Sequence, residues 1–146
     1  MQATLDQVCE QLGGEETFGV EVQSESEMEG LLREGLPVAV LAKLRENWGL
    51  TIMELAGSLS IPKSTLMRML ERRNRMASAD SDRVYRLASI LAMAEEYIGD
   101  RNKAQRWLRQ PNQGLGDQTP LRTLDTEIGA RRVEQLLGRI AYGGVS

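Results

Sequence analysis

The sequence contains no histidine, a single cysteine (Cys9) and few aromatic residues, which make up 4% of the chain. The lack of histidine removes the commonest general base, the Ser–His and Cys–His nucleophile arrangements and most transition-metal sites. One cysteine allows neither an internal disulfide nor a thiolate-rich metal site. An enzyme built on carboxylates or lysine stays open, but we expect a protein that is not an enzyme and needs no cofactor.

The chain also lacks long apolar runs, since no stretch approaches the roughly 20 apolar residues that span a bilayer. Its first 30 residues have no cationic start followed by an apolar segment, so they do not resemble a secretory signal. Apolar residues form 41% of the 146 residues, which is enough for folded cores. These features predict a cytoplasmic protein that has no membrane partner.

Charge is distributed unevenly along the chain. Residues 1–35 hold nine acids and one base, a net charge of −8, whereas residues 36–146 hold 17 bases and 12 acids, a net charge of +5. We predict that residues 1–35 form an acidic leader, partly disordered or forming a short helix. The leader either keeps the chain in solution, which is the simpler interpretation, or shields a basic module that attracts nucleic acid.

Leu, Ala, Met, Arg and Glu dominate the sequence and recur at helical spacing, which predicts an all-α fold. We expect a helix-turn-helix bundle over residues 36–99 and a small helical C-terminal domain over residues 100–146. Gly49 ends the first helix of the bundle, and Thr51 with Glu54 forms a capping box for the second.

The next two helix starts are also predicted from capping residues. Ser64 is expected to cap the third helix of the bundle, and Ser81 to begin a long fourth helix. Ser60 stands at the turn between the second and third helices, where the backbone is often left-handed, so this serine must tolerate or avoid that conformation.

The second and third helices of the bundle have the packing pattern of a helix-turn-helix. Leu55 and the small Ala56 lie where the helices cross, and Leu66 and Met69 anchor the second of the pair. Its outer face then carries groups that suit phosphates and base edges in a DNA groove. The candidate DNA-binding residues are Lys63, Ser64, Thr65, Met67, Arg68, Arg72 and Arg73. The alternative is a helical hairpin whose basic residues form a solvated face.

The C-terminal part begins and ends its helices with recognisable residues. Asp100 can cap a short helix, and Thr119 precedes Pro120 as an N-cap followed by proline at the first helical position. Thr126 can cap the last helix, in which Gly129 allows another backbone to approach closely. The residues expected on the inward face of the last helix are Ile128, Val133, Leu136, Leu137 and Ile140.

The most specific pattern in the chain lies between Ala104 and Val145. Its elements are Trp107-Leu108, Pro111-Asn112, Leu115-Gly116, Thr119-Pro120-Leu121, Leu124-Asp125-Thr126, Gly129, Val133, Leu137, Arg139 and Ile140. This pattern closely resembles the C-terminal domain of the Xre/MbcA/ParS antitoxins, which are partners of RES-domain toxins. An upstream helix-turn-helix is also the arrangement of that family, so the resemblance covers residues 36–146.

The resemblance implies that the chain is the antitoxin of a type II toxin–antitoxin system. In that family the C-terminal region covers the active site of a RES toxin that degrades NAD or transfers ADP-ribose to a protein. The toxin-binding residues that this implies are Arg131, Arg132, Arg139, Tyr142, Gly143, Gly144, Val145 and Ser146. The family commonly ends in a single glycine and an apolar pair, from which this tail departs.

The resemblance also implies a homodimer within a toxin–antitoxin assembly and repression of the antitoxin's own operon through operator DNA. An alternative function is a helix-turn-helix transcriptional regulator whose C-terminal unit only dimerises. That regulator would bind an operator without any toxin partner, so the two functions differ in whether a toxin is bound.

Overall fold

The computed structural model describes residues 3–143, and this part of the chain is helical and contains no strand. In chain order the helices are α1 (Leu5–Gln11), α2 (Gly14–Phe18), α3 (Glu25–Glu34), α4 (Ala39–Trp48), α5 (Ile52–Leu59), α6 (Lys63–Glu71), α7 (Ser78–Ile98), α8 (Arg101–Leu108), the 3-10 turn η1 (Gln113–Leu115), α9 (Pro120–Thr123) and α10 (Glu127–Gly143). The all-α fold predicted from the sequence is confirmed.

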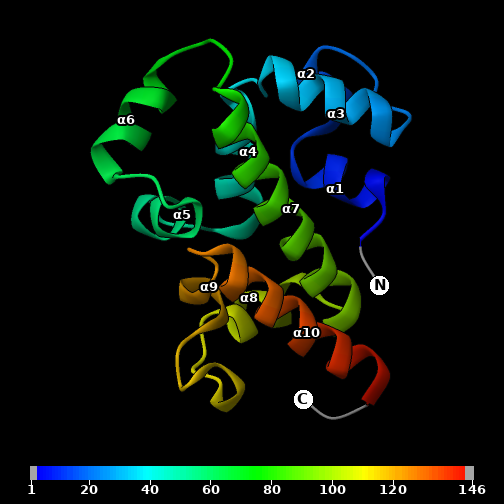
Figure 1. The fold of residues 1–146 in the computed structure, drawn as a ribbon, viewed down its shortest axis with the longest axis vertical. Helices are drawn as coiled ribbons and strands as arrows, with labels where there is room; N and C mark the ends of the chain where they lie inside the picture. The colour runs from blue at the N-terminus through cyan, green and yellow to red at the C-terminus, as the bar shows by residue number, and fades with distance from the viewer. Residues whose placement is uncertain (1–2, 144–146) are drawn as a thin grey trace.

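Helix α7 is the centre of the molecule. It packs against α1 and α3 from the N-terminal segment, against α5, and against α8 and α10 from the C-terminal part. Figure 1 shows α7 running through the molecule beside α10, with α6 at the far edge. Buried apolar residues from all of these helices form one hydrophobic cluster, so the N-terminal segment, the helix-turn-helix and the C-terminal part share a core.

The helix-turn-helix forms as the sequence predicts. Gly49 ends α4 in a left-handed conformation, and Thr51 and Glu54 make both hydrogen bonds of the capping box at the start of α5. Ser60 adopts the left-handed backbone with φ 55°, which few residues other than glycine do. The hydroxyl of Ser60 donates to the carbonyl oxygen of Asp125, so the residue with the strained backbone also contacts the C-terminal part.

The acidic segment is more ordered than the predicted leader, partly disordered or forming a short helix, because three helices, α1, α2 and α3, form between residues 5 and 34. Val8, Phe18 and Met28 are buried in the common core. Glycines at both ends of α2 have positive φ, so the chain reverses within a few residues. Three helices of seven, five and ten residues are too short for a clear periodic pattern of apolar residues. Their few apolar residues all belong to the hydrophobic core or pack against it.

Three local predictions are wrong. Helix α6 begins at Lys63 after Pro62, and no side chain caps it, so Ser64 is not its cap. Helix α7 begins at Ser78, and Ser81 is instead buried with its hydroxyl oxygen accepting a hydrogen bond from the Leu36 amide at 2.8 Å. Ile128 faces outward and is 70% exposed, because the core side of α10 starts one residue later, at Gly129.

The helix starts predicted for the C-terminal part are confirmed. Asp100 accepts hydrogen bonds from two amides of α8, and Thr119 caps α9 with Pro120 at its first position. Thr126 accepts a hydrogen bond from the Gly129 amide at 2.9 Å at the start of α10. A Cβ at Gly129 would lie 1.9 Å from the Thr123 carbonyl oxygen, so only glycine allows α10 to pass this close to α9.

Candidate partner-binding surfaces

The candidate DNA-binding residues lie on the outer side of α6 and just after it. Leu66 is fully buried and fixes α6 against α5, which leaves the opposite face of α6 in solvent. Six of the seven candidates are exposed and Thr65 is half-buried, where it accepts a weak hydrogen bond from Arg68 at 3.4 Å. The structure therefore brings together the residues that the sequence placed on one face, and DNA binding by them stays a prediction.

The chain after α6 is held in place by contacts that the sequence did not reveal. The side chain of Arg75 donates to the carbonyl oxygen of Gly35 at 2.9 Å. The amide of Met76 donates to the carbonyl oxygen of Leu36 at 2.8 Å. A Cβ at Gly35 would lie 2.0 Å from the Met76 carbonyl oxygen. The loop that carries Arg72 and Arg73 is thus pinned beside the start of α4.

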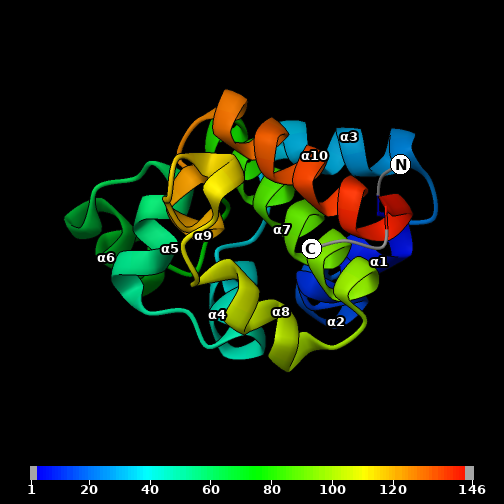
Figure 2. The same ribbon diagram turned by 90° about the horizontal axis from the view of Figure 1, so that it is seen from below.

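The acidic helices lie away from α6. Helices α1 and α2 pack on α4, and α1 and α3 pack on α7, while α6 packs against α5 and α4. In both Figure 1 and Figure 2, α1 to α3 lie on the opposite side of the molecule from α6. Helices α1 to α3 therefore do not cover the basic face of α6 within one chain.

The candidate toxin-binding residues extend along the outer face of α10. Arg131, Arg132, Arg139, Tyr142 and Gly143 are exposed, whereas Ala130, Val133 and Leu137 on the other side of the helix are buried. Gly144, Val145 and Ser146 lie outside the described residues. Figure 2 shows the C-terminal end of α10 and helix α6 at opposite ends of the molecule.

Helix α5 is joined to the C-terminal part by an ion pair. Arg109, at the end of α8, donates to both carboxylate oxygens of Glu54 at 2.9 and 3.0 Å, and also to the carbonyl oxygen of Gly49 at 3.1 Å. The hydrogen bonds from Arg109 hold the pKa of Glu54 below its ordinary value, against the opposite effect of partial burial. Sequence reasoning assigned Glu54 only to the capping box, and no signal linked it to Arg109.

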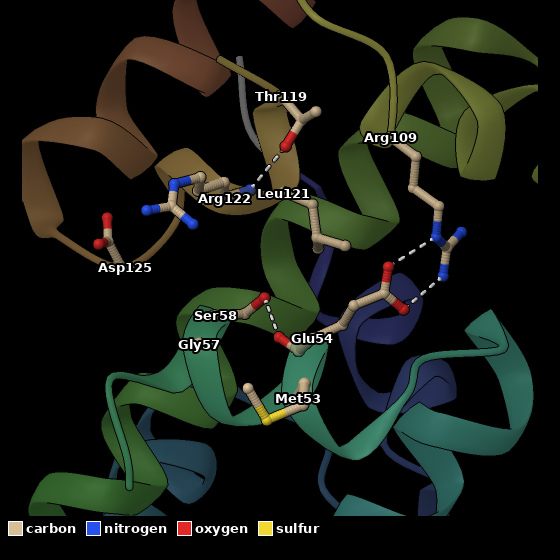
Figure 3. A pocket seen from close by; sticks show the side chains of 9 residues that line it. All are labelled: Met53, Glu54, Gly57, Ser58, Arg109, Thr119, Leu121, Arg122 and Asp125. Carbon is tan, nitrogen blue, oxygen red and sulfur yellow. Dashed lines mark hydrogen bonds and ion pairs between the residues drawn. The ribbon is translucent and has the colours of Figure 1, made fainter. Parts of the chain in front are cut away.

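A groove of about 520 Å³ opens beside this ion pair, between α5 and α9 (Figure 3). Its lining residues are Met53, Glu54, Gly57, Ser58, Arg109, Thr119, Leu121, Arg122 and Asp125. Among residues 3–143, no group of three His, Cys, Asp or Glu residues is placed to hold a metal ion. No helix in that range is both long and apolar enough to cross a membrane.

Comparison with known proteins identifies both halves of the chain. Residues 93–143 match the antitoxin Xre/MbcA/ParS C-terminal toxin-binding domain, and residues 27–89 match the antitoxin Xre-like helix-turn-helix domain. The Antitoxin Xre of Pseudomonas putida is 37% identical over 123 residues, which cover 84% of this chain and 76% of the relative. The chain belongs to the Xre/MbcA/ParS family of antitoxins.

Two further comparisons agree with this assignment. The Antitoxin Xre of Photorhabdus laumondii is 34% identical to this antitoxin over 135 residues, covering 89% of this chain and 88% of the relative. A chain of the M. tuberculosis MbcT–MbcA toxin–antitoxin complex matches with a TM-score of 0.53 and 21% identity, covering 75% of this antitoxin and 96% of that chain. That likeness supports the fold. The domain boundaries expected at residues 36, 99 and 100 stay a prediction.

Proposed function

We propose that this antitoxin neutralises a RES-domain toxin, which degrades NAD or transfers ADP-ribose, by laying α10 and the chain after it over the toxin's active site. The observation that carries the proposal is the match of residues 93–143 to a toxin-binding domain whose last helix has an exposed outer face. The similar chain from M. tuberculosis belongs to a toxin–antitoxin complex. The antitoxin acts by stoichiometric binding and not by catalysis.

The arginines of α10 supply the chemistry for this binding. A guanidinium pairs well with a carboxylate, and it can also fill the space that a nucleotide needs. Arg131 pairs with Glu127 at 3.2 Å, with both side chains more than 60% exposed, so this contact contributes only about 0.3–0.5 kcal/mol and is readily exchanged. Arg132 donates to the Gly114 carbonyl oxygen at 3.0 Å, and the side chain of Arg139 has no hydrogen bond or ion pair within residues 3–143.

Repression of the antitoxin's operon is the second part of the proposal. The exposed residues of α6 suit an operator's phosphates and base edges, and the match to a helix-turn-helix domain supports this use. Because α6 and the C-terminal end of α10 lie at opposite ends of the molecule (Figure 2), a toxin held at that end leaves α6 accessible to an operator. A homodimer would place its half-sites about 34 Å apart, or a multiple of that distance.

Removing residues 142–146 tests the active-site proposal. Full-length antitoxin co-expressed with the proposed RES toxin should preserve growth and cellular NAD, and the truncated chain should lose both. Circular dichroism of the truncated chain checks that α10 still forms. Undiminished protection by a folded, truncated chain would sink the tail-blocking mechanism. Operator binding without any toxin binding by the full chain would instead favour a regulator whose C-terminal unit only dimerises.

A further inference from the structure

The groove between α5 and α9 has one wall in each of the two matched domains. Four of its lining residues lie on α5, within the segment that matches the helix-turn-helix domain. The other five lie between the end of α8 and the start of α10, within the segment that matches the toxin-binding domain. A partner that fills the groove therefore contacts both domains at once (Figure 3).

The two walls are held in a fixed relation to each other. The bidentate pair of Arg109 with Glu54 joins them at one end, and the hydrogen bond from Ser60 to the Asp125 carbonyl oxygen joins them close by. A groove that is already formed binds without the cost of ordering its walls.

The packing of residues 3–143 does not explain why position 57, on the α5 wall, is a glycine. It lies in the interior of α5, where a glycine makes the helix less stable than an alanine would. Its φ is not positive. A Cβ placed on it would meet no atom within 4 Å, so nothing in residues 3–143 requires position 57 to lack a side chain. Met53, one helical turn earlier on the same face, is 63% exposed. A bare backbone beside an exposed apolar side chain suits the close approach of another chain.

The opposite wall offers charges that this chain does not use. The side chains of Arg122 and Asp125 are exposed, and neither has a hydrogen bond or ion pair within residues 3–143. Ile128, on the first turn of α10 just beyond Asp125, is 70% exposed. This rim therefore carries one cation, one anion and an apolar side chain, and it continues directly into the outer face of α10.

We propose that the toxin inserts a segment into this groove, placing an apolar side chain on Met53 and its backbone against Gly57, with Arg122 and Asp125 engaging opposite charges at the rim. The inference rests on the proposed toxin partnership and extends its contact surface. The toxin is favoured over a second antitoxin because five lining residues belong to the segment matching the toxin-binding domain and are continuous with α10.

A pair of glycine substitutions tests the proposal. Gly57→Leu fills the groove, and Gly30→Leu makes the same change inside α3, where a Cβ also meets no atom within 4 Å. The binding of the purified toxin to each purified full-length chain is measured by isothermal titration calorimetry. The Kd of Gly57→Leu should be weaker than that of the wild type by about tenfold or more, and the Kd of Gly30→Leu should change by no more than about twofold. Helical circular dichroism and Tm confirm that both variants fold.

A charge reversal provides a second measurement. Arg122→Glu should weaken toxin binding, with a loss that shrinks as salt is raised, because the contact at the rim is partly exposed. Arg106→Glu is its matched control, since Arg106 is an exposed arginine of the same C-terminal part that does not line the groove. Loss of affinity in Arg122→Glu but not in Arg106→Glu supports the proposal.

The other outcomes separate this inference from the proposed function. Equal toxin affinity for wild type, Gly57→Leu and Gly30→Leu overturns the groove contact while the toxin partnership stands. Absence of toxin binding by the wild type overturns the partnership itself. A Gly57→Leu chain that keeps toxin affinity but loses self-association in sedimentation, or loses operator binding, assigns the groove to a second copy or to DNA and also overturns the proposal.

Discussion

The ion pair between Glu54 and Arg109 is one of the contacts that fix the helix-turn-helix to the C-terminal part. Its two hydrogen bonds measure 2.9 and 3.0 Å, and the two side chains are 27% and 33% exposed. Fully exposed pairs contribute about 0–1 kcal/mol, and bidentate geometry with partial burial places this one near the upper end. We expect a coupling free energy of about 1 kcal/mol between the two residues.

Glu54→Gln separates this pair from the capping box. Glutamine at the same position can still accept a hydrogen bond from the Thr51 amide, as glutamate does at 3.0 Å, so the cap survives while the charge is lost. Glu54→Ala removes both and should cost about 1 kcal/mol more. Arg109→Met completes a double-mutant cycle in which the other hydrogen bonds of Arg109 cancel. Urea unfolding followed by circular dichroism at pH 7 measures each variant.

The same cycle has a predictable dependence on pH. The folded-state pKa of Glu54 lies below its unfolded value, so the pair's stabilisation is fully present above the unfolded pKa, about 4.3, and is lost as pH falls through the folded pKa. Wild type should therefore lose its advantage over Glu54→Gln in acid. A coupling of zero at pH 7, or one that persists unchanged after Glu54 is protonated, would refute this account of the pair.

Two further predictions test the N-terminal segment and the α6 surface. Gln11→Leu should lower the free energy of unfolding by about 2 kcal/mol, because the buried indole N–H of Trp48 loses its acceptor at 2.6 Å. Gln105→Leu is the control, because the side chain of Gln105 makes no hydrogen bond in residues 3–143. An unchanged free energy of unfolding in Gln11→Leu would contradict the buried contact. Arg68→Ala should weaken operator binding in a gel-shift assay and reduce its salt slope by about one phosphate contact, with toxin affinity unchanged; equal loss of both would identify Arg68 as structural.

The features that could be predicted from the sequence are those set by neighbouring residues. A capping box needs a side chain and an amide three residues apart, and the one at Thr51 and Glu54 forms as expected. The caps at Asp100 and Thr119 and the close approach at Gly129 are equally local and equally confirmed. For the same reason, the exposed face of α6 can be predicted from Leu66, which is its buried anchor.

The features that could not be predicted depend on residues far apart in the chain. Gln11 contacts Trp48 across 37 positions and Glu54 contacts Arg109 across 55, and neither pair has a sequence pattern that joins its members. The nine acids of residues 1–35 predict a solvated leader, whereas the few apolar residues among them give no clear pattern. Its apolar residues are buried because α4 and α7 present a surface for α1 to α3, which exists only in the folded chain.

The arrangement of these contacts limits how toxin binding can affect operator binding. Helix α10 packs on α7, and α7 accepts a hydrogen bond from the Leu36 amide through Ser81, so the chain entering α4 is fixed to the same central helix. A toxin that touches only the outer face of α10 is therefore separated from α6 by α7 or α9 and by α5. A toxin that also fills the groove contacts Gly57 on α5, the helix against which α6 packs. The influence of the toxin on operator affinity should thus weaken in Gly57→Leu, unless it arises from the spacing of two antitoxin copies on the DNA.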